Sequence, residues 1–195
     1  MFMKNNLTIK RIVSISLMTA VICAISPFAI TLPISPVPIS LSTFAIYLAI
    51  IILGGRDALI SVALYVMLGF VGLPVFTGFT GGAGKIMGPT GGYIIGYMFL
   101  AIIEGAFDDA AYKNRSYDEK DTSTTNIKKF LGMLLGTGVL YIFGSLWLAK
   151  QANMSLIAAF SVGIFPFVVG DVVKMLFALF IGTRIRRALI KNNLI

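Results

Sequence analysis

The hydrophobic residues of this chain gather into six long apolar runs that are separated by short polar segments. The runs cover about residues 12–29, 39–53, 58–72, 90–106, 129–149 and 166–183. Each is near the ~17–25 residues that an α-helix needs to cross a bilayer, although the second and third are short. The pattern predicts an all-α integral membrane protein, a bundle of six transmembrane helices whose last helix reaches about residue 190. We expect residues 1–195 to form a single membrane domain.

The polar segments between the runs predict how the helices are connected. Gly54–Gly55–Arg56–Asp57 predicts a tight turn between the second and third helices, with Asp57 capping the third. Residues 107–128 are rich in charged residues, serine and threonine and predict a solvated linker. Residues 153–163 predict a short interfacial helix, so that Pro166 would lie in the first turn of the final span.

The distribution of basic residues predicts the orientation in the membrane. With six spans, both termini, the loop at Arg56 and residues 107–128 share one side, which then holds 13 of the 16 basic residues. The other side has only Lys85 and Lys150, while Lys174 lies within the last span. Because loops rich in Lys and Arg stay in the cytoplasm, we expect both termini and the 107–128 linker to be cytoplasmic. With 57% apolar and 12% charged residues, no separate soluble domain is expected.

Several kinds of chemistry are excluded by the residues that the chain lacks. It has no histidine and one cysteine, Cys23, which excludes histidine-based catalysis, a Cys/His zinc site and an internal disulfide. Gly84–Lys85 resembles part of a P-loop, but Phe79 replaces the leading glycine and Ile86 replaces the Ser/Thr that would hold magnesium. We therefore expect no metal and no ATP site, so that ATP-driven transport would require a partner protein.

Asp171 and Lys174 are the charged residues within the final apolar run, and their spacing places them on one helix face. Counted from Pro166, they lie about 8 and 12 Å below the outer end of the helix. Ionised groups at that depth cost several kcal/mol unless they are paired or hydrated. They could hold helices together, but we favour a ligand site because buried pairs add little stability over apolar packing. A carboxylate beside an ammonium suits a neutral polar ligand with N–H and C=O groups.

Two further patterns involve small residues. Residues 78–92 contain seven glycines and predict a Gly-rich outer loop between helices 3 and 4, either a re-entrant loop or lid over a cavity or a site of close helix packing. In the first helix, Ser16, Ala20 and Ala24 recur every four residues and permit another helix to approach closely. From these residues alone we favour packing inside the bundle over a contact with another subunit.

Four motifs follow one another along the chain: Pro33 with Pro36–Val37–Pro38, Val71–Gly72–Leu73–Pro74–Val75–Phe76, Gly88–Pro89–Thr90–Gly91–Gly92–Tyr93, and Pro166–Phe167 followed by Gly170–Asp171 and Lys174. In this order they resemble the BioY family, the biotin-specific substrate-binding (S) components of energy-coupling factor (ECF) vitamin transporters. The resemblance runs from the first helix to the sixth. At the start of the second helix the chain has Ser42–Thr43 where the family's pattern has Gln followed by Thr or Asn.

The resemblance implies biotin uptake at a bacterial-type cell membrane rather than an enzymatic activity. The chain would capture biotin on the extracellular side and deliver it inward with a transmembrane coupling (T) subunit and two ATPase subunits, which use the ATP; it would bind no cofactor itself. Asp171 and Lys174 match the family's ligand pocket, and Tyr93, Thr43, Phe76 and Lys85 are further candidates for ligand binding. Lys85 is the candidate for the ligand's carboxylate. Ser16, Ala20 and Ala24 match the family's surface for the coupling subunit, which reverses the preference for internal packing.

Three alternatives stay open at this point. The first is an S component for another small vitamin, and the second is a solitary proton-coupled carrier. Secondary carriers often show inverted repeats, which are not evident in this sequence. The third is an intramembrane enzyme with Asp171 as base, for which the sequence offers no nucleophile–base set or metal ligands.

Overall fold

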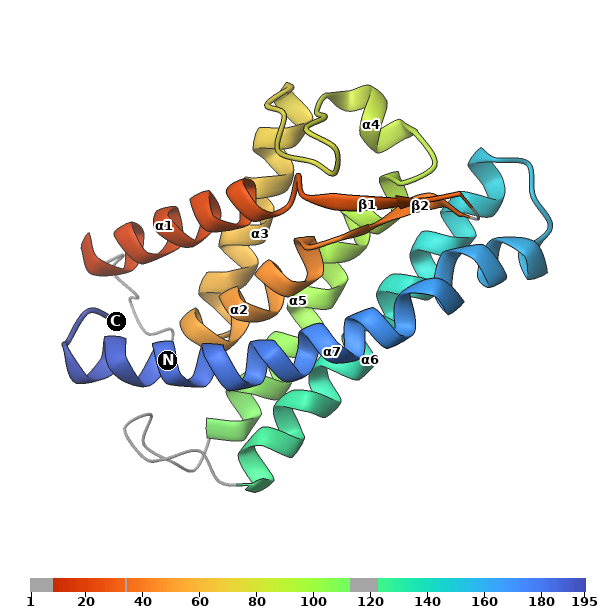
Figure 1. Cartoon of the computed structure of the whole chain (residues 1–195). Helices are drawn as coiled ribbons and strands as arrows, with labels where there is room; N and C mark the ends of the chain where they lie inside the picture. The colour runs from red at the N-terminus through yellow and green to blue at the C-terminus, as the bar shows by residue number, and fades with distance from the viewer. Residues whose placement is uncertain (1–8, 34, 113–122) are drawn as a thin grey trace, which may run out of the picture.

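The computed structural model describes residues 9–33, 35–112 and 123–195, and these residues form seven helices and one two-stranded sheet (Figure 1). A helix lies at each of the six apolar runs, and a short seventh one, α4, lies between the third and fourth. The elements are α1 (Ile9–Ile25), β1 (Ala29–Leu32), β2 (Ser35–Ser40), α2 (Ser42–Leu53), α3 (Gly55–Val71), α4 (Ala83–Met87), α5 (Gly91–Tyr112), α6 (Ser123–Gln151) and α7 (Leu156–Lys191).

Helix α2 lies at the centre of the bundle, which explains why a run of only 12 residues is apolar on all sides. Ten of its residues are buried, and it packs against α1, α3, α5 and α7. One residue, Gly54, separates α2 from α3, with a φ of 85° that favours glycine. The next residue, Gly55, meets Gly105 of α5 so closely that a Cβ would lie 2.7 Å from its backbone. The tight turn is therefore confirmed.

The predicted helix cap at Asp57 is wrong. Gly54, which has no side chain, occupies the N-cap position of α3, and the Gly55 N–H of the first turn donates instead to Asp109 Oδ1 of α5 at 3.3 Å. Asp57 instead accepts hydrogen bonds from the guanidinium group of Arg11 on α1. Because a cap must precede the first helical turn, the early start of the helix at Gly55 leaves Asp57 inside that turn.

Helices α5 and α6 form the closest antiparallel pair, and both extend into the predicted linker. Glycines permit the approach: a Cβ on Gly96 would lie 2.6 Å from Leu140, and one on Gly136 would lie 2.8 Å from Leu100. Helix α5 continues to Tyr112 and α6 begins at Ser123, so the solvated linker 107–128 was predicted too long at both ends. Asp108 in particular is 1% exposed, because charged partners on other helices enclose it. The remaining linker residues lie outside the described part of the chain.

The last helix, α7, begins ten residues before Pro166, and the prediction of a separate interfacial helix at residues 153–163 is wrong. Ser155 caps the N-terminus of α7 by accepting a hydrogen bond from the Ala158 N–H. Pro166 lies inside the helix rather than in its first turn. Its ring removes one backbone hydrogen bond, a loss that helices of membrane bundles tolerate when neighbouring groups satisfy the freed carbonyl.

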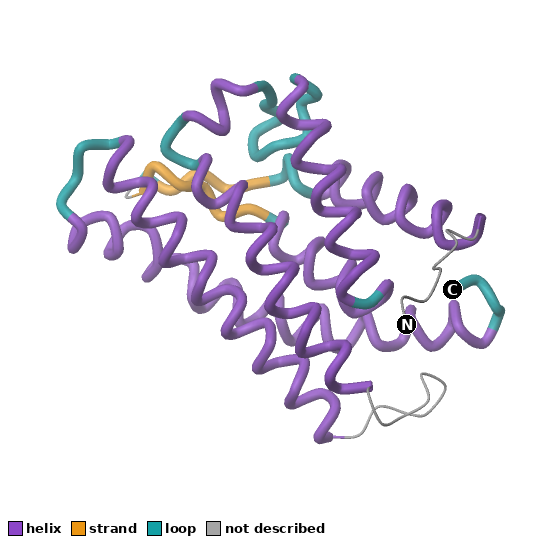
Figure 2. The backbone as a smooth tube through the Cα atoms, turned by 180° about the vertical axis from the view of Figure 1, so that it is seen from behind, coloured by secondary structure: helices purple, strands orange, loops and turns teal. Residues whose placement is uncertain are grey.

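A β-hairpin joins α1 to α2, where the apolar pattern predicted only a helix end, so the fold is predominantly helical rather than all-α. Strands β1 and β2 pair antiparallel, with Ala29 opposite Ser40. Pro36 and Pro38 lie in β2, which a two-stranded sheet tolerates because each strand has a free edge. Figure 2 shows the hairpin lying across one end of the bundle, beside the Gly-rich segment that holds α4.

The Gly-rich segment between α3 and α5 contacts the start of the hairpin. Gly78 donates a backbone hydrogen bond to the Pro27 carbonyl, and the rings of Phe28 and Phe79 meet edge to face at 5.5 Å. At Gly91 a Cβ would lie 1.6 Å from the Ile86 carbonyl oxygen, so that no other residue fits this turn. The segment and the hairpin therefore form one continuous cover over this end of the bundle.

Among the described helices, Thr124–Gln151 and Leu156–Lys191 are each long and apolar enough to cross a membrane. Helix α7 exposes large apolar side chains along much of its length, among them Val169, Val173, Phe177 and Phe180. An exposed apolar surface of this extent suits contact with lipid rather than water.

Candidate functional site

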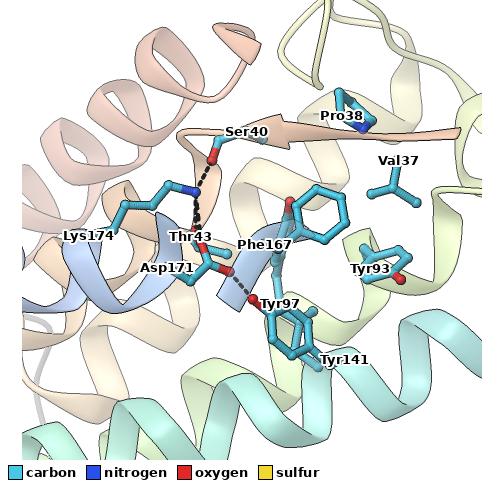
Figure 3. Close-up of a pocket in the computed structure, with 11 residues that line it drawn as sticks. Val37, Pro38, Ser40, Thr43, Tyr93, Tyr97, Tyr141, Phe167, Asp171 and Lys174 are labelled. Atoms are coloured by element: carbon cyan, nitrogen blue, oxygen red, sulfur yellow. Dashed lines mark hydrogen bonds and ion pairs between the residues drawn. The ribbon is translucent and has the colours of Figure 1, made fainter. Parts of the chain in front are cut away.

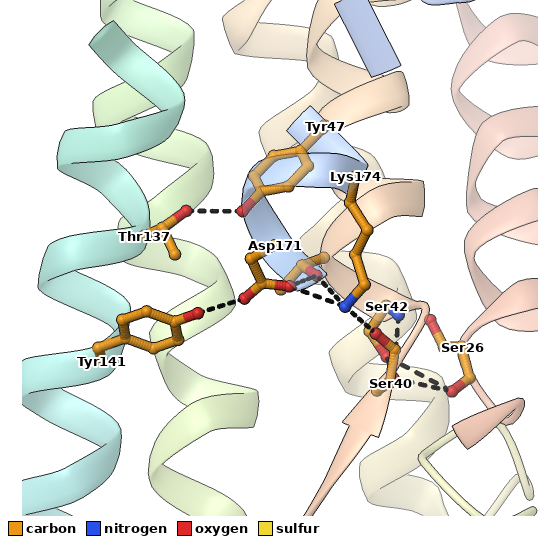
Figure 4. Close-up of polar contacts among 9 residues, drawn as sticks. Ser26, Ser40, Ser42, Tyr47, Thr137, Tyr141, Asp171 and Lys174 are labelled. Atoms are coloured by element: carbon orange, nitrogen blue, oxygen red, sulfur yellow. Dashed lines mark hydrogen bonds and ion pairs between the residues drawn. The ribbon is translucent and has the colours of Figure 1, made fainter. Parts of the chain in front are cut away.

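The carboxylate of Asp171 lies in the interior of the bundle and accepts hydrogen bonds from three different helices (Figure 4). Its Oδ1 accepts from Lys174 Nζ at 2.7 Å and from Thr43 Oγ1 at 3.2 Å, and its Oδ2 accepts from the Tyr141 hydroxyl at 2.5 Å. Lys174 belongs to α7, Thr43 to the first turn of α2 and Tyr141 to α6. Asp171 is 4% exposed, so these donors replace water around the buried charge.

The ammonium group of Lys174 connects this carboxylate to the hairpin. Its Nζ donates to the Ser40 carbonyl at the end of β2, at 2.6 Å, and lies 3.4 Å from Thr43 Oγ1. The predicted Asp171–Lys174 pair on one helix face is therefore present as an ion pair. Because one of the ammonium's partners is a backbone carbonyl of the hairpin, the position of Lys174 depends on where the hairpin lies.

A small cavity lies beside the ion pair, between the hairpin and helices α2, α5, α6 and α7 (Figure 3). Its volume is about 40 Å³, little more than a single water molecule occupies. The polar side of the cavity is the Asp171 network, and the rest is aromatic or aliphatic. Its lining residues are Val37, Pro38, Ser40, Thr43, Tyr93, Tyr97, Leu140, Tyr141, Phe167, Asp171 and Lys174.

The hairpin is fixed over the cavity by side-chain contacts at both of its ends. Ser35 at the start of β2 donates from its hydroxyl to the Val162 carbonyl on α7, at 2.8 Å. At the other end, the Ser40 carbonyl accepts from Lys174. Alternation along the strand turns Val37 inward, where it is buried, and leaves Pro36 exposed. The strand thus closes the cavity with an apolar side chain.

Four of the residues predicted to bind a ligand line this cavity: Asp171, Lys174, Thr43 and Tyr93. Tyr93 contributes its ring, because its hydroxyl already donates to the Gly163 carbonyl at 3.0 Å. Phe76 and Lys85 do not line it. Phe76 is fully buried in the Gly-rich segment, packed edge to face on Tyr65, and Lys85 is partly exposed on α4.

The structure adds cavity residues that the sequence reasoning missed, of which Tyr141 has the shortest contact with Asp171. A tyrosine within an apolar span carries a hydroxyl that usually finds a partner when buried, and this signal could have selected Tyr141. Tyr97 and Phe167 are also buried at the cavity. Tyr97 follows Tyr93 by one helical turn of α5, a spacing that could have been noticed.

The stripe of small residues on α1 faces outward. Ser16, Ala20 and Ala24 are all exposed and line a groove of about 630 Å³ between α1 and α3. Apolar side chains of α3, among them Leu64 and Leu68, form its other wall. Within the described residues, no other helix covers these three positions, so they are free to contact another subunit.

Fold and site together define the class: a helical membrane protein that holds a buried acid–ammonium site beneath a hairpin. The BioY family model matches residues 3–191, and the chain belongs to the BioY family. It is 35% identical over 158 residues to the biotin transporter BioY of Thermotoga maritima, covering 81% of this chain and 86% of that protein. It is 32% identical over 180 residues to the biotin transporter BioY2 of Lactococcus lactis subsp. cremoris, covering 92% and 91%.

A solved structure has the same fold. The crystal structure of the S-component for biotin from an ECF-type ABC transporter superposes with a TM-score of 0.82 at 30% identity, covering 95% of each chain. The resemblance drawn from the four motifs is thus confirmed. Because the named relatives are transporters, the intramembrane enzyme is no longer a competing interpretation.

Proposed function

We propose that this chain is the S component of an ECF-type transporter and that it binds biotin for uptake. The observation that carries the proposal is the Asp171–Lys174 pair at a small, largely apolar cavity. A carboxylate offers about four acceptor positions, of which three are used by Lys174, Thr43 and Tyr141. Biotin's ureido ring has two N–H donors and a carbonyl, which complement the carboxylate and the ammonium. Its thiophane ring and aliphatic tail suit the aromatic and aliphatic lining.

The cavity must enlarge before a vitamin can enter. A volume of about 40 Å³ is far below the ~300–1,000 Å³ of typical ligand pockets. The hairpin is the element whose displacement would enlarge it most simply, because β2 supplies Val37, Pro38 and Ser40 to the lining. Movement of the hairpin would also release Lys174 from the Ser40 carbonyl and make its ammonium available to the ligand. Lys85, on the neighbouring cover, stays a prediction for the ligand's carboxylate, and Phe76 stays a prediction as a ligand contact.

The proposal is tested by isothermal titration of the purified protein with biotin, together with mass spectrometry of any ligand that copurifies. We expect saturable binding of biotin and no comparable binding of other small vitamins. Binding of a different vitamin, with none of biotin, would keep the S-component assignment and overturn the substrate. Absence of binding by a folded sample would overturn the function.

We further propose that residues 1–195 form one membrane domain with six crossing helices, both termini in the cytoplasm and the Gly-rich segment outside. The support is the helix at each apolar run and the collection of 13 of the 16 basic residues on one side. Ligand would then enter from outside past the hairpin.

Thiol labelling of intact cells tests this orientation. In a Cys23→Ala background, we expect an impermeant reagent to label Gly84→Cys and Gln151→Cys, because both positions lie on the side with few basic residues. Ser116→Cys, in the part of the linker outside the described residues, should react only after the cells are opened. Labelling of Ser116→Cys in sealed cells would show that the orientation is wrong.

The partners that we propose are a transmembrane coupling subunit and two ATPase subunits, which would supply the ATP chemistry. Ser16, Ala20 and Ala24 form the proposed contact with the coupling subunit, because they are small, exposed and aligned on one face. This chain itself would bind no cofactor.

Replacing Ala20 or Ala24 by leucine should weaken association with the coupling subunit and leave biotin affinity unchanged. A branched side chain prevents close approach of a partner helix, and neither residue lines the cavity. Copurification with the coupling module and biotin titration measure the two effects. Ile12→Leu is the matched control, since Ile12 is exposed on the same helix but outside the groove. Equal loss of biotin affinity would assign the stripe to packing within the chain.

A further inference from the structure

Glu104 on α5 is a buried acid that the ligand site does not use. It is 1% exposed, and among the described residues neither of its carboxylate oxygens has a hydrogen-bond partner. Asp171, by comparison, accepts from three donors. A buried polar group without a partner is rare in proteins and calls for an explanation, and an ionisable one within a membrane bundle is usually functional.

Glu104 lies beside a second buried cluster of charged side chains. Asp108 follows it by one turn on α5, Lys129 comes from α6, and Arg186 of α7 joins the cluster through its contact with Asp108. Asp108 Oδ2 accepts from Arg186 Nη1 at 2.9 Å, and Asp108 Oδ1 lies 3.8 Å from Lys129 Nζ. Both cations thus contact Asp108, whereas neither carboxylate oxygen of Glu104 accepts a hydrogen bond from a described residue. Helix α3 approaches α5 here through the Gly55–Gly105 backbone contact, and the Gly55 N–H donates to Asp109 Oδ1 at 3.3 Å.

Polar groups connect this cluster to the ligand site through the interior of the bundle. The fully buried Tyr47 of α2 shares a hydrogen bond of 2.6 Å with Thr137 of α6 (Figure 4). Tyr47 lies within electrostatic range of both Asp171 and Glu104. Along α6, Thr137 is one turn from Tyr141, which bonds Asp171, and two turns from Lys129. The two ends of this path, Tyr141 and Lys129, are therefore about three helical turns apart on α6, on the order of 18 Å.

The environment of Glu104 favours its neutral form. An ionised carboxylate without hydrogen bonds costs far more to bury than a neutral acid does, and the nearby Asp108 carboxylate adds repulsion. We propose that Glu104 is a proton-binding site of this transporter and that its protonation holds the packed state in which the Asp171 network is assembled. The carboxylate oxygen forms an O–H bond with a proton taken from hydronium, which leaves water; on ionisation that bond breaks and the proton returns to water.

Ionisation of Glu104 would disturb the ligand site through helix packing. The new charge would attract Lys129 or water into the interface between α5 and α6, where Gly132 and Gly136 leave no spare space beside α5. The same two helices carry Tyr93 and Tyr141 of the cavity. If the packed state becomes a minor population, the apparent affinity for ligand falls in proportion. This consequence rests on the proposed biotin binding, whereas the proton site itself does not.

Infrared spectroscopy of the full-length protein tests the proton site without any ligand. At neutral pH we expect the wild type to show the C=O stretching band of a protonated carboxylic acid, shifted in D2O and lost on alkaline titration. Glu104→Gln should lack the band. If Glu104→Gln folds poorly, Glu104→Leu is measured in its place and should also lack the band. Asp109→Asn is the matched control, because Asp109 is an exposed acid on the same helix, and it should keep the band. A wild type without the band, or a band of equal intensity in Glu104→Gln, would overturn the proposal.

Biotin titration at several pH values tests the link to the ligand site. We expect wild-type affinity to fall about tenfold once alkaline pH ionises Glu104, while Glu104→Gln, which stays neutral, retains the affinity it has at neutral pH. Asp109→Asn should follow the wild type. Identical pH profiles for wild type and Glu104→Gln would refute the link while leaving biotin binding intact, whereas absence of biotin binding at every pH would refute the proposed function instead.

Discussion

The Asp171→Asn variant should lose most of its affinity for biotin, by about 2–5 kcal/mol, which corresponds to roughly 30-fold to several thousandfold in Kd. The amide keeps one acceptor oxygen where the carboxylate has two, and it carries no charge. Lys174, whose side chain is 13% exposed, would lose the anion at 2.7 Å that balances its own charge. If the amide oxygen accepts from the Tyr141 hydroxyl, no second oxygen is left to accept from the ligand's N–H groups. If the amide is rotated the other way, its NH2 group faces the Tyr141 hydroxyl and that hydrogen bond is changed.

Loss of affinity must be separated from loss of folding, because Asp171 also joins helices α2, α6 and α7. Thermal stability is therefore measured in the same samples as the isothermal titration. Asp57→Asn is the matched control: it makes the same chemical change to an acid that pairs with Arg11 and lies outside the cavity. It should bind biotin like the parent. If Asp171→Asn stays folded and also binds like the parent, the Asp171 network is structural and the proposed site is wrong.

The sequence predicted the polar pair of the site and two more residues of the cavity, Thr43 and Tyr93, but not the rest of the lining. Asp171 and Lys174 lie three residues apart on one helix, so their contact depends only on helix geometry. Thr43 and Tyr141 reach the same carboxylate from other helices, and their contacts depend on how those helices pack. Thr43 was found through the family resemblance and not through periodicity. Tyr141 was missed because the 129–149 run was considered only for its hydropathy.

The fold, like the site, was predictable where a feature depends on one segment of the chain and not where it depends on contacts between distant segments. Six apolar runs predicted six helices because hydrophobicity is a property of each segment by itself. The hairpin at residues 29–40 was missed because it is short and its second strand holds Pro36 and Pro38, which disfavour most strands. Charge density likewise predicted residues 107–128 to be solvated, although Asp108 is buried. Its burial depends on Lys129 and Arg186, and Arg186 is far away in sequence.

Asp108→Asn should be among the most destabilising single substitutions in this protein, although it lies outside the ligand cavity. Asp108 is 1% exposed and accepts from Arg186 Nη1 at 2.9 Å, while Lys129 Nζ lies at 3.8 Å. Arg186 Nη1 also donates to the Ile51 carbonyl at the end of α2, so that the cluster joins α2, α5, α6 and α7. Removing the carboxylate leaves two buried cations without its charge. Breaking a buried ion pair in this way costs about 3–5 kcal/mol.

For a chain of this size that cost corresponds to a decrease in Tm of roughly 6–20 °C, measured by thermal unfolding in detergent. Asp109→Asn, on the next residue of α5, is the control and should change Tm little, because Asp109 is exposed and the amide oxygen can still accept from the Gly55 N–H. The double variant Asp108→Asn/Lys129→Met removes one charge of each sign and should recover part of the loss, since it relieves the excess positive charge. Below the lowered Tm, Asp108→Asn should still bind biotin because Asp108 does not line the cavity, but more weakly at any pH where the loss of the Asp108 carboxylate lets Glu104 ionise. A Tm for Asp108→Asn that equals the Asp109→Asn value would show that the cluster does not hold these four helices together.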